Sequence, residues 1–289
     1  MAESYTGVRV VEVRPELIDQ LYKEKHIDID FDQRRKFYQN EYVVLKDITG
    51  ASQSALTRVT GSRLSLLKLD KDLCISGVKP RNKEQWMAFD ALLDESIKVV
   101  VLTGTAGSGK TLASTACAFH HLEKKHYKRV VFTRIMTQVG KHDLGILPGD
   151  VDEKFNPYLK NYMCNFELLF DKKKSSIDDI LQQYDVEFLP FQLIRGASFI
   201  NTLLIADECQ TLDVLEMLTL GTRMSEGSKI VILGDLKQRD EKIAREKTGI
   251  FRFVNSEQAK QSSIVASIEL IKSERGETAS LFASIFEEQ

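Results

Sequence analysis

The sequence predicts an α/β fold, in which a parallel sheet is flanked by helices and preceded by a small β-rich N-terminal module. Three observations lead to this prediction. An apolar run at 99–103 ends in a glycine-rich turn, and the turn opens a helix of small residues at 111–121. A second short apolar strand follows at 129–134, and a strand–helix–strand unit of this spacing makes the sheet parallel. Two more apolar runs, at 203–206 and 229–233, are typical of strands buried on both faces.

The glycine-rich turn fits a phosphate-binding pattern, in which glycine is followed by any four residues and then by Gly-Lys-Ser/Thr. Glycines let the backbone approach an anion, and N–H groups point to that anion at the positive end of the next helix. We expect Lys110 to reach the β- and γ-phosphates and the Thr111 hydroxyl to ligate Mg²⁺. The alternative is a chance glycine turn, but the strand before it and the helix after it favour phosphate binding. The expected loop residues are Gly104, Thr105, Ala106, Gly107, Ser108, Gly109, Lys110 and Thr111.

The composition of the whole chain limits its partners. Hydrophobic residues make up 43% and charged residues 28% of the 289 residues, which is ordinary for a globular protein. The formal net charge of -2 produces no global attraction to nucleic acid, so a polyanion would need a local basic patch. No apolar run approaches membrane-spanning length, and we expect a soluble cytosolic protein without a membrane partner. Four cysteines without paired spacing are expected to be reduced and buried: Cys74, Cys117, Cys164 and Cys209.

Residues 1–73 differ from the rest of the chain and are predicted to form the small β-rich module, with 74–289 as the phosphate-loop domain. The elements expected in the module are strands at 8–13 and 42–45, a short helix from Pro15 and a hairpin at 55–67. Its acidic residues are expected to form a solvated surface rather than a metal site: Glu24, Asp28, Asp30 and Asp32.

Two carboxylates follow the apolar run at 203–206 directly. Acids at the carboxyl end of a buried parallel strand lie where such sheets bind their ligands. We expect Asp207 to hold Mg²⁺ opposite Thr111, which leaves Glu208 to activate an attacking water. The pattern is weak by itself. It gains weight downstream of a phosphate loop, because the ion there requires an acid.

Two glutamines have both a functional and a structural interpretation. Gln238 follows the strand at 229–233 and is a candidate for touching the γ-phosphate and the water; the alternative is a solvated turn residue. Gln85 begins a helix at 85–93, and from the residues alone an exposed helix-cap amide is favoured. Aromatic residues at 158, 162 and 166 form one stripe of a helix, which is expected to face the core rather than to stack bases.

These stretches together resemble the PhoH-like ATPases. The resemblance covers roughly residues 75–275 in order. Its Leu-Pro-Gly-Asp and Arg-Gly stretches occur in few other phosphate-loop families. The matching stretches lie at 77–85, 104–111, 127–134, 144–158, 194–196, 207–210 and 234–238.

The resemblance implies a RecA-like core similar to the first motor domain of superfamily 1 helicases. It implies that Gln85 reads adenine, which reverses the interpretation given above, and that Gln238 senses the γ-phosphate. It implies that Arg275 is supplied to the ATP of a neighbouring subunit, and therefore a homo-oligomeric ring, expected to be a hexamer. The module at 1–73 resembles the connector that follows a PIN nuclease domain in some members, so ribonuclease activity is not expected.

The resulting hypothesis is Mg²⁺-dependent ATP hydrolysis coupled to binding or remodelling of single-stranded RNA or DNA. The catalytic residues would be Lys110, Glu208, Gln238 and Arg275. The candidates for the nucleic-acid face are Arg134, Lys141 and Arg195, each with a surface ion pair as the alternative. Two other classes remain open, which are an ATP-gated assembly protein with little turnover and a P-loop kinase.

Overall fold

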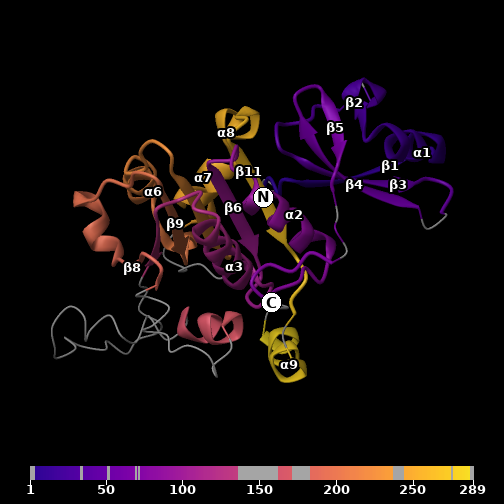
Figure 1. The fold of residues 1–289 in the computed structure, drawn as a ribbon. Helices are drawn as coiled ribbons and strands as arrows, with labels where there is room; N and C mark the ends of the chain where they lie inside the picture. The colour runs from indigo at the N-terminus through magenta and orange to yellow at the C-terminus, as the bar shows by residue number, and fades with distance from the viewer. Residues whose placement is uncertain are drawn as a thin grey trace.

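A computed structural model describes residues 4–32, 35–50, 53–68, 70, 72–135, 162–170, 183–236, 244–274 and 276–286. Within these residues the strands form two sheets, one near the N-terminus and one in the remainder of the chain (Figure 1). Lys141, Gln238 and Arg275 lie outside the described residues.

The N-terminal sheet has five strands in the order β1-β3-β4-β5-β2, with only the β1–β3 pair parallel. Helix α1 covers one face and buries Ile18 and Leu21 against Leu45 and Leu64. The helix begins at Pro15, whose fixed φ suits a first helical turn. The elements are β1 (Val8–Val13), α1 (Pro15–Glu24), β2 (His26–Asp28), η1 (Ile29–Asp32), β3 (Tyr42–Asp47), β4 (Ser54–Thr60) and β5 (Arg63–Leu66).

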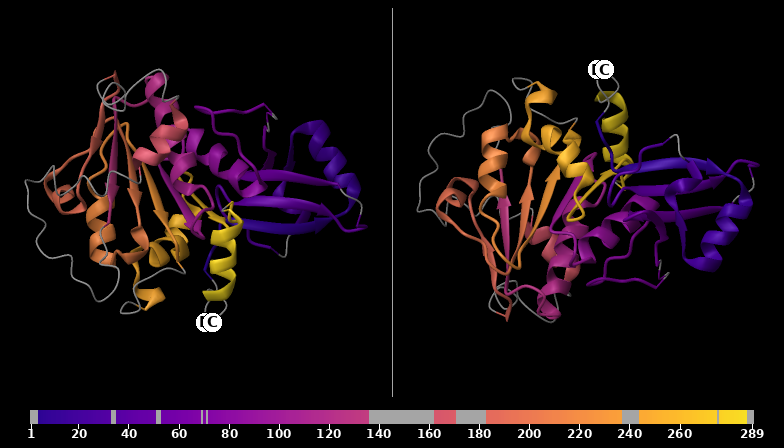
Figure 2. Two further views of the ribbon diagram at one scale, coloured as in Figure 1. Left: turned by 90° about the horizontal axis from the view of Figure 1, so that it is seen from below. Right: turned by 90° about the horizontal axis from the view of Figure 1, so that it is seen from above.

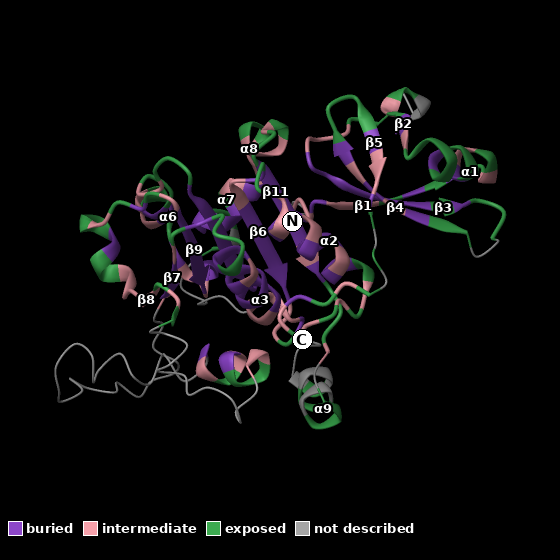
Figure 3. Ribbon diagram, in the orientation of Figure 1, coloured by how far each residue is buried: buried purple, intermediate pink, exposed green. Residues whose placement is uncertain are grey.

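The central sheet has six strands in the order β11-β6-β10-β9-β7-β8, and all its pairs are parallel. Its strands read as nearly continuous apolar runs because both faces are covered (Figure 3). The fold class is therefore confirmed. The strands are β6 (Val99–Gly104), β7 (Arg129–Arg134), β8 (Val186–Phe188), β9 (Thr202–Asp207), β10 (Lys229–Gly234) and β11 (Val265–Leu270).

Helices cover the two faces of this sheet separately. On one face α2, α3 and the helix at 162–169 pack over side chains such as Leu102, and on the other α6 and α7 pack over side chains such as Val101. Figure 2 shows the C-terminal helix α9 standing out from the body. The remaining elements are α2 (Lys83–Leu93), α3 (Lys110–Glu123), η2 (Phe191–Gly196), η3 (Cys209–Thr211), α6 (Val214–Gly221), η4 (Arg245–Lys247), α7 (Gly249–Asn255), α8 (Glu257–Gln261) and α9 (Glu277–Phe286).

The N-terminal sheet is joined to the central one by polar contacts. The Asn40 side chain donates to the carbonyl oxygens of Ser263 and Val265, at 2.8 and 3.0 Å. Arg58 forms ion pairs with Asp90 (2.9 Å) and Asp94 (2.6 Å) at the end of α2. Because these contacts cross the expected boundary at residue 73, the division into two domains stays a prediction.

Buried polar groups also fix the carboxyl end of α2. Lys229, at the start of β10, is fully buried and its Nζ donates to the carbonyl oxygens of Ala91, Leu92 and Asp94 at 2.7–2.9 Å. His121, near the end of α3, contacts the Leu92 carbonyl through Nε2 at 2.9 Å. Burial lowers the pKa of Lys229 to about 8 and that of His121 to about 4. Helix α2 is thereby anchored to two elements whose other ends form the candidate site.

The cysteine prediction was half wrong. All four cysteines are free, and Cys117 and Cys209 are buried, but Cys74 and Cys164 are exposed. Cys74 lies in the irregular segment before α2, and Cys164 lies on a helix that turns Tyr162 and Phe166 towards the core instead. Those two aromatic residues confirm the core interpretation of the stripe, apart from residue 158, which is not described. No helix in the described part of the chain is long and apolar enough to span a membrane.

We expect Gly104→Ala to be strongly destabilising. Gly104 has φ +127°, and a methyl group there would collide with the carbonyl oxygen of Leu270 on β11. The loss in unfolding free energy should reach about 3 kcal/mol or more in chemical denaturation. Gly61→Ala is the matched control, because Gly61 has φ +62° with nothing within 4 Å, and it should lose only about 1 kcal/mol. Equal losses would contradict the steric explanation.

The stability should depend on the protonation of His121. Its pKa of about 4 is below the ordinary 6.5, so the unfolded chain takes up the proton first as the pH falls. Between pH 6.5 and pH 4 the wild type should lose about 3 kcal/mol more unfolding free energy than His121→Gln, whose amide keeps a donor for Leu92. Urea denaturation at several pH values measures both proteins. If the two proteins lose stability in parallel as the pH falls, protonation of His121 is not the cause.

Candidate functional site

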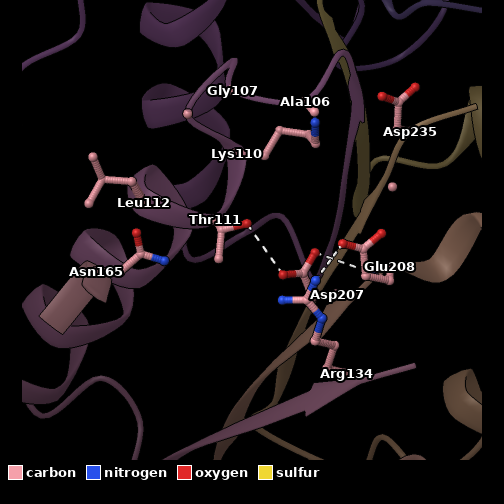
Figure 4. A pocket seen from close by; sticks show the side chains of 12 residues that line it. Ala106, Gly107, Lys110, Thr111, Leu112, Arg134, Asn165, Asp207, Glu208 and Asp235 are labelled. Atoms are coloured by element: carbon pink, nitrogen blue, oxygen red, sulfur yellow. Dashed lines mark hydrogen bonds and ion pairs between the residues drawn. The ribbon is translucent and has the colours of Figure 1, made fainter. Parts of the chain in front are cut away.

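The parallel register brings the carboxyl ends of four strands to one edge of the central sheet. Gly234 of β10 pairs with Thr103 of β6, and Arg134 of β7 pairs with Asp207 of β9. A pocket of about 340 Å³ opens at this edge (Figure 4). It is lined by Ala106, Gly107, Gly109, Lys110, Thr111, Leu112, Arg134, Asn165, Asp207, Glu208, Gly234 and Asp235.

The glycine-rich loop leads from β6 into α3. Gly104, Gly107 and Gly109 all have positive φ, at 127°, 78° and 89°, so the loop needs their conformational freedom. Gly109 is the N-cap of α3 and has no side chain to accept from the first helical N–H groups, which suits them to an anion. Lys110 Nζ donates to the carbonyl oxygens of Gly104 (2.7 Å) and Thr105 (2.9 Å) within the loop.

The hydroxyl at the start of α3 meets the first acid of the pair. Thr111 Oγ1 lies 3.4 Å from Asp207 Oδ2. Asp207 is 7% exposed, and burial together with the neighbouring Glu208 raises the pKa of its carboxyl group. A hydroxyl and a buried carboxylate at this distance are hard oxygen donors of the type that Mg²⁺ prefers.

The second acid is held by two donors. Glu208 Oε1 accepts from Arg134 Nη2 at 2.8 Å, and Oε2 accepts from Gln210 Nε2 at 2.7 Å. Figure 4 shows the Arg134 guanidinium next to the acid pair, with its hydrogen bond to the Glu208 carboxylate drawn as a dashed line. Arg134, expected on a nucleic-acid face, therefore lies inside the pocket against the carboxylate.

Gln85 is not the exposed cap amide that the residues alone favoured. It is 7% exposed; its Nε2 donates to Ser108 O at 3.1 Å, and its Oε1 accepts from the Arg81 N–H at 2.8 Å. The cap of α2 is Asn82, whose side chain accepts from the Gln85 N–H at 2.9 Å. Gln85 is buried because the phosphate loop folds over it.

A second pocket, of about 430 Å³, adjoins the first and shares Gly107, Gly109 and Leu112 with it. Gln85 lines it beside the apolar side chains of Phe89 and Leu168. The acid pair lines the first pocket, whereas the second combines apolar side chains with Gln85 and the charged residues Lys79, Arg81 and Glu274.

The structure thus brings most predicted site residues together. Lys110, Thr111, Asp207 and Glu208 share one pocket, and Ser108 is fully buried beneath it. Arg195 is exposed at the end of η2, where its carbonyl oxygen accepts from Arg223 Nη1 at 3.3 Å.

Sequence reasoning assigned no role to Gln210, Asp235 or Asn165. Asp235 directly follows β10, and Asp207 is the last residue of β9, so the same signal, an acid after an apolar run, was available for both. Gln210 stands two residues after the acid pair, and its inward direction depends on the turn at Glu208. Asn165 had no signal, since it lies in an apolar helical segment.

Comparisons with known proteins identify the family. A model of the family described as PhoH-like protein matches residues 77–287. The chain is 37% identical over 290 residues to Protein PhoH2 of Bacillus subtilis, covering 98% of this chain and 64% of that protein. It is 32% identical to Protein PhoH2 of Mycolicibacterium smegmatis, covering 100% of this chain and 64% of that protein. The chain therefore spans a little under two thirds of the length of these relatives.

Among solved structures, the Pif1 helicase from Candida albicans matches with a TM-score of 0.38 and 18% identity, covering 73% of this chain and 44% of that chain. The family match includes the whole central sheet, the glycine-rich loop and the acid pair. The chain belongs to the PhoH-like protein family.

Proposed function

We propose that this chain hydrolyses ATP to ADP and inorganic phosphate, with the triphosphate bound by the loop at 104–111. The main support is the pocket that Lys110 and Thr111 share with Asp207 and Glu208, in which Thr111 Oγ1 and Asp207 Oδ2 are 3.4 Å apart. Loop N–H groups and Lys110 would bind the phosphate oxygens. To do so, Lys110 would exchange its loop carbonyl acceptors for phosphate oxygens.

Thr111 and Asp207 are the residues that would hold Mg²⁺. One hydroxyl and one carboxylate match the way this ion binds, with substrate phosphates and water completing its coordination. When bound, it would neutralise charge on the β- and γ-phosphate oxygens. A cation next to Asp207 also favours its charged form, which burial alone disfavours.

Gln85 and the pocket beside it are the proposed base site. Leu112, Phe89 and Leu168 offer apolar surface for a planar ring. Beyond its contacts with Ser108 O and Arg81 N–H, the Gln85 amide retains a second N–H and a second oxygen lone pair for the base. Base and phosphates would then lie on either side of the shared Gly107–Gly109 wall.

Glu208 is the proposed group for the water. In the reaction the water oxygen bonds to the γ-phosphorus, the bond from that phosphorus to the bridging oxygen breaks, and the water proton passes to the Glu208 carboxylate before release. Arg134 and Gln210 hold that carboxylate in place before the reaction starts, which is the kind of preorganisation that lowers a barrier. Gln238 as γ-phosphate sensor stays a prediction.

Coupling to single-stranded RNA or DNA, and assembly into a ring with Arg275 acting on a neighbouring subunit, are further parts of the proposal. Exposed Arg195 is the described candidate for strand contact. The residue before Arg275, Glu274, donates its N–H to Gly107 O of its own chain at 3.0 Å. The role of Arg275, which lies outside the described residues, is proposed from the family resemblance.

Lys110→Ala should reduce ATP turnover by about a thousandfold or more, because the variant lacks the cation for the β- and γ-phosphates. Phosphate release at saturating ATP and Mg²⁺ measures it. Lys23→Ala, on α1, is the control and should keep wild-type turnover. Wild-type hydrolysis by Lys110→Ala would end the assignment. Phosphate transfer to an added acceptor would indicate a kinase, and nucleotide-dependent assembly without turnover would indicate an assembly protein.

Single-stranded RNA should raise the hydrolysis rate several-fold at low salt, and the effect should fade as salt releases the phosphate contacts. The experiment compares RNA, DNA and duplex oligonucleotides of one length on protein whose mass in solution is known. Arg195→Ala should weaken the stimulation without changing the basal rate. A rate that no strand alters, together with no strand binding at low salt, would refute the coupling.

A further inference from the structure

One buried amide joins the ends of two strands beside the pocket. Gln210 lies on η3, directly after the acid pair, and is 4% exposed. Its Nε2 donates to Glu208 Oε2 at 2.7 Å, and its Oε1 accepts from the backbone N–H of Asp235 at 3.1 Å. A single side chain therefore connects the end of β9 to the end of β10.

The backbone of Glu208 adopts an unusual conformation at this point. Its φ of 60° and ψ of 33° lie in the left-handed region, which residues other than glycine rarely adopt. The turn is stabilised by the Glu208 N–H, which donates to Asp207 Oδ1 at 2.9 Å, and by the Thr211 hydroxyl, which donates to Glu208 O at 3.2 Å. With Arg134 on Oε1 and Gln210 on Oε2, both carboxylate oxygens have a fixed donor.

Strand β10 leaves room for this amide. A Cβ on Gly234 would lie 3.3 Å from both Gln210 N and Gln210 Oε1, and 3.0 Å from Ile250 Cδ1. Gly234 does not have a positive φ, so a glycine is not required here by the backbone conformation. Glycine suits the position because a side chain would crowd the space that Gln210 fills. The strand end and the amide thus fit each other closely.

We propose that Gln210 is a positioning residue, which aims the Glu208 carboxylate at the attacking water and ties it to the segment that follows β10. The inference rests on the proposed ATP hydrolysis. The amide meets both demands at once, because the carboxylate needs a donor and the Asp235 N–H needs an acceptor. In Gln210→Glu, the side chain would still accept from the Asp235 N–H, but it would place a second negative charge next to the Glu208 carboxylate.

The test compares Gln210→Glu and Gln210→Ala with the wild type at saturating ATP. For both variants kcat should fall about ten- to a hundredfold, while the KM for ATP stays within about threefold, since Gln210 lies away from the phosphate loop. Gln20→Glu is the matched control. Gln20 Nε2 also donates to a glutamate, Glu24, at 3.2 Å, but on the exposed face of α1, so its kcat should not change.

The division of the effect between kcat and KM separates positioning from a merely structural role. The charged groups around Glu208 in the pocket are Arg134, Asp207, Lys110 and Asp235, and both Gln210 variants retain all of them. A loss confined to kcat therefore indicates a misplaced Glu208 carboxylate, because ATP binding by the loop is intact. A structural defect of the pocket would raise the KM for ATP as well.

Other results of these measurements would contradict the proposed role of Gln210. Wild-type kcat in both Gln210 variants would overturn the inference, as would a loss of ATP affinity as large as the loss of kcat. Should Gln210→Ala fail to fold, the isosteric Gln210→Glu carries the test. Lys110→Ala is measured alongside. If the wild type has no turnover that depends on Lys110, the proposed function fails; if it has, but Gln210 does not influence it, only this inference fails.

Discussion

The parallel register of the central sheet is the constraint on which the rest depends. Because all its strand pairs run the same way, every strand delivers its carboxyl end to one edge. Gly104 and Asp207 are 103 positions apart in the chain, and both meet Gly234 at this edge. One strand reversed would send its polar end to the opposite side of the molecule.

The site also places charges of both signs close together in a partly buried pocket. Two adjacent carboxylates would repel each other, and burial raises the pKa of the Asp207 carboxyl group further. Arg134 offsets part of this, and the neutral Gln210 amide adds a donor without adding charge. Strand β7 therefore contributes the cation Arg134 to the same pocket to which α3 contributes Lys110.

The sequence was most informative where local chemistry and topology agree. A glycine-rich turn between a strand and a helix, and acids at the end of an apolar run, each demand one geometry, and the loop at 104–111 and Asp207 adopt it. It was least informative where a side chain's surroundings come from distant segments. Gln85 looks like a surface cap until the loop folds over it, and Arg134 looks like a surface cation until β9 places Glu208 beside it. Single-residue patterns contain neither fact.

The distribution of the four cysteines has a practical consequence. Cys117 and Cys209 are fully buried, and burial raises the pKa of both thiols, so they should be inert towards maleimides. Cys74 and Cys164 are exposed, and each is close in the chain to a residue that lines one of the two pockets, Gly77 and Asn165 respectively. The natural thiols therefore offer two attachment points for fluorophores or spin labels in segments that reach the two pockets, and movements of these segments can be followed without introducing any new residue.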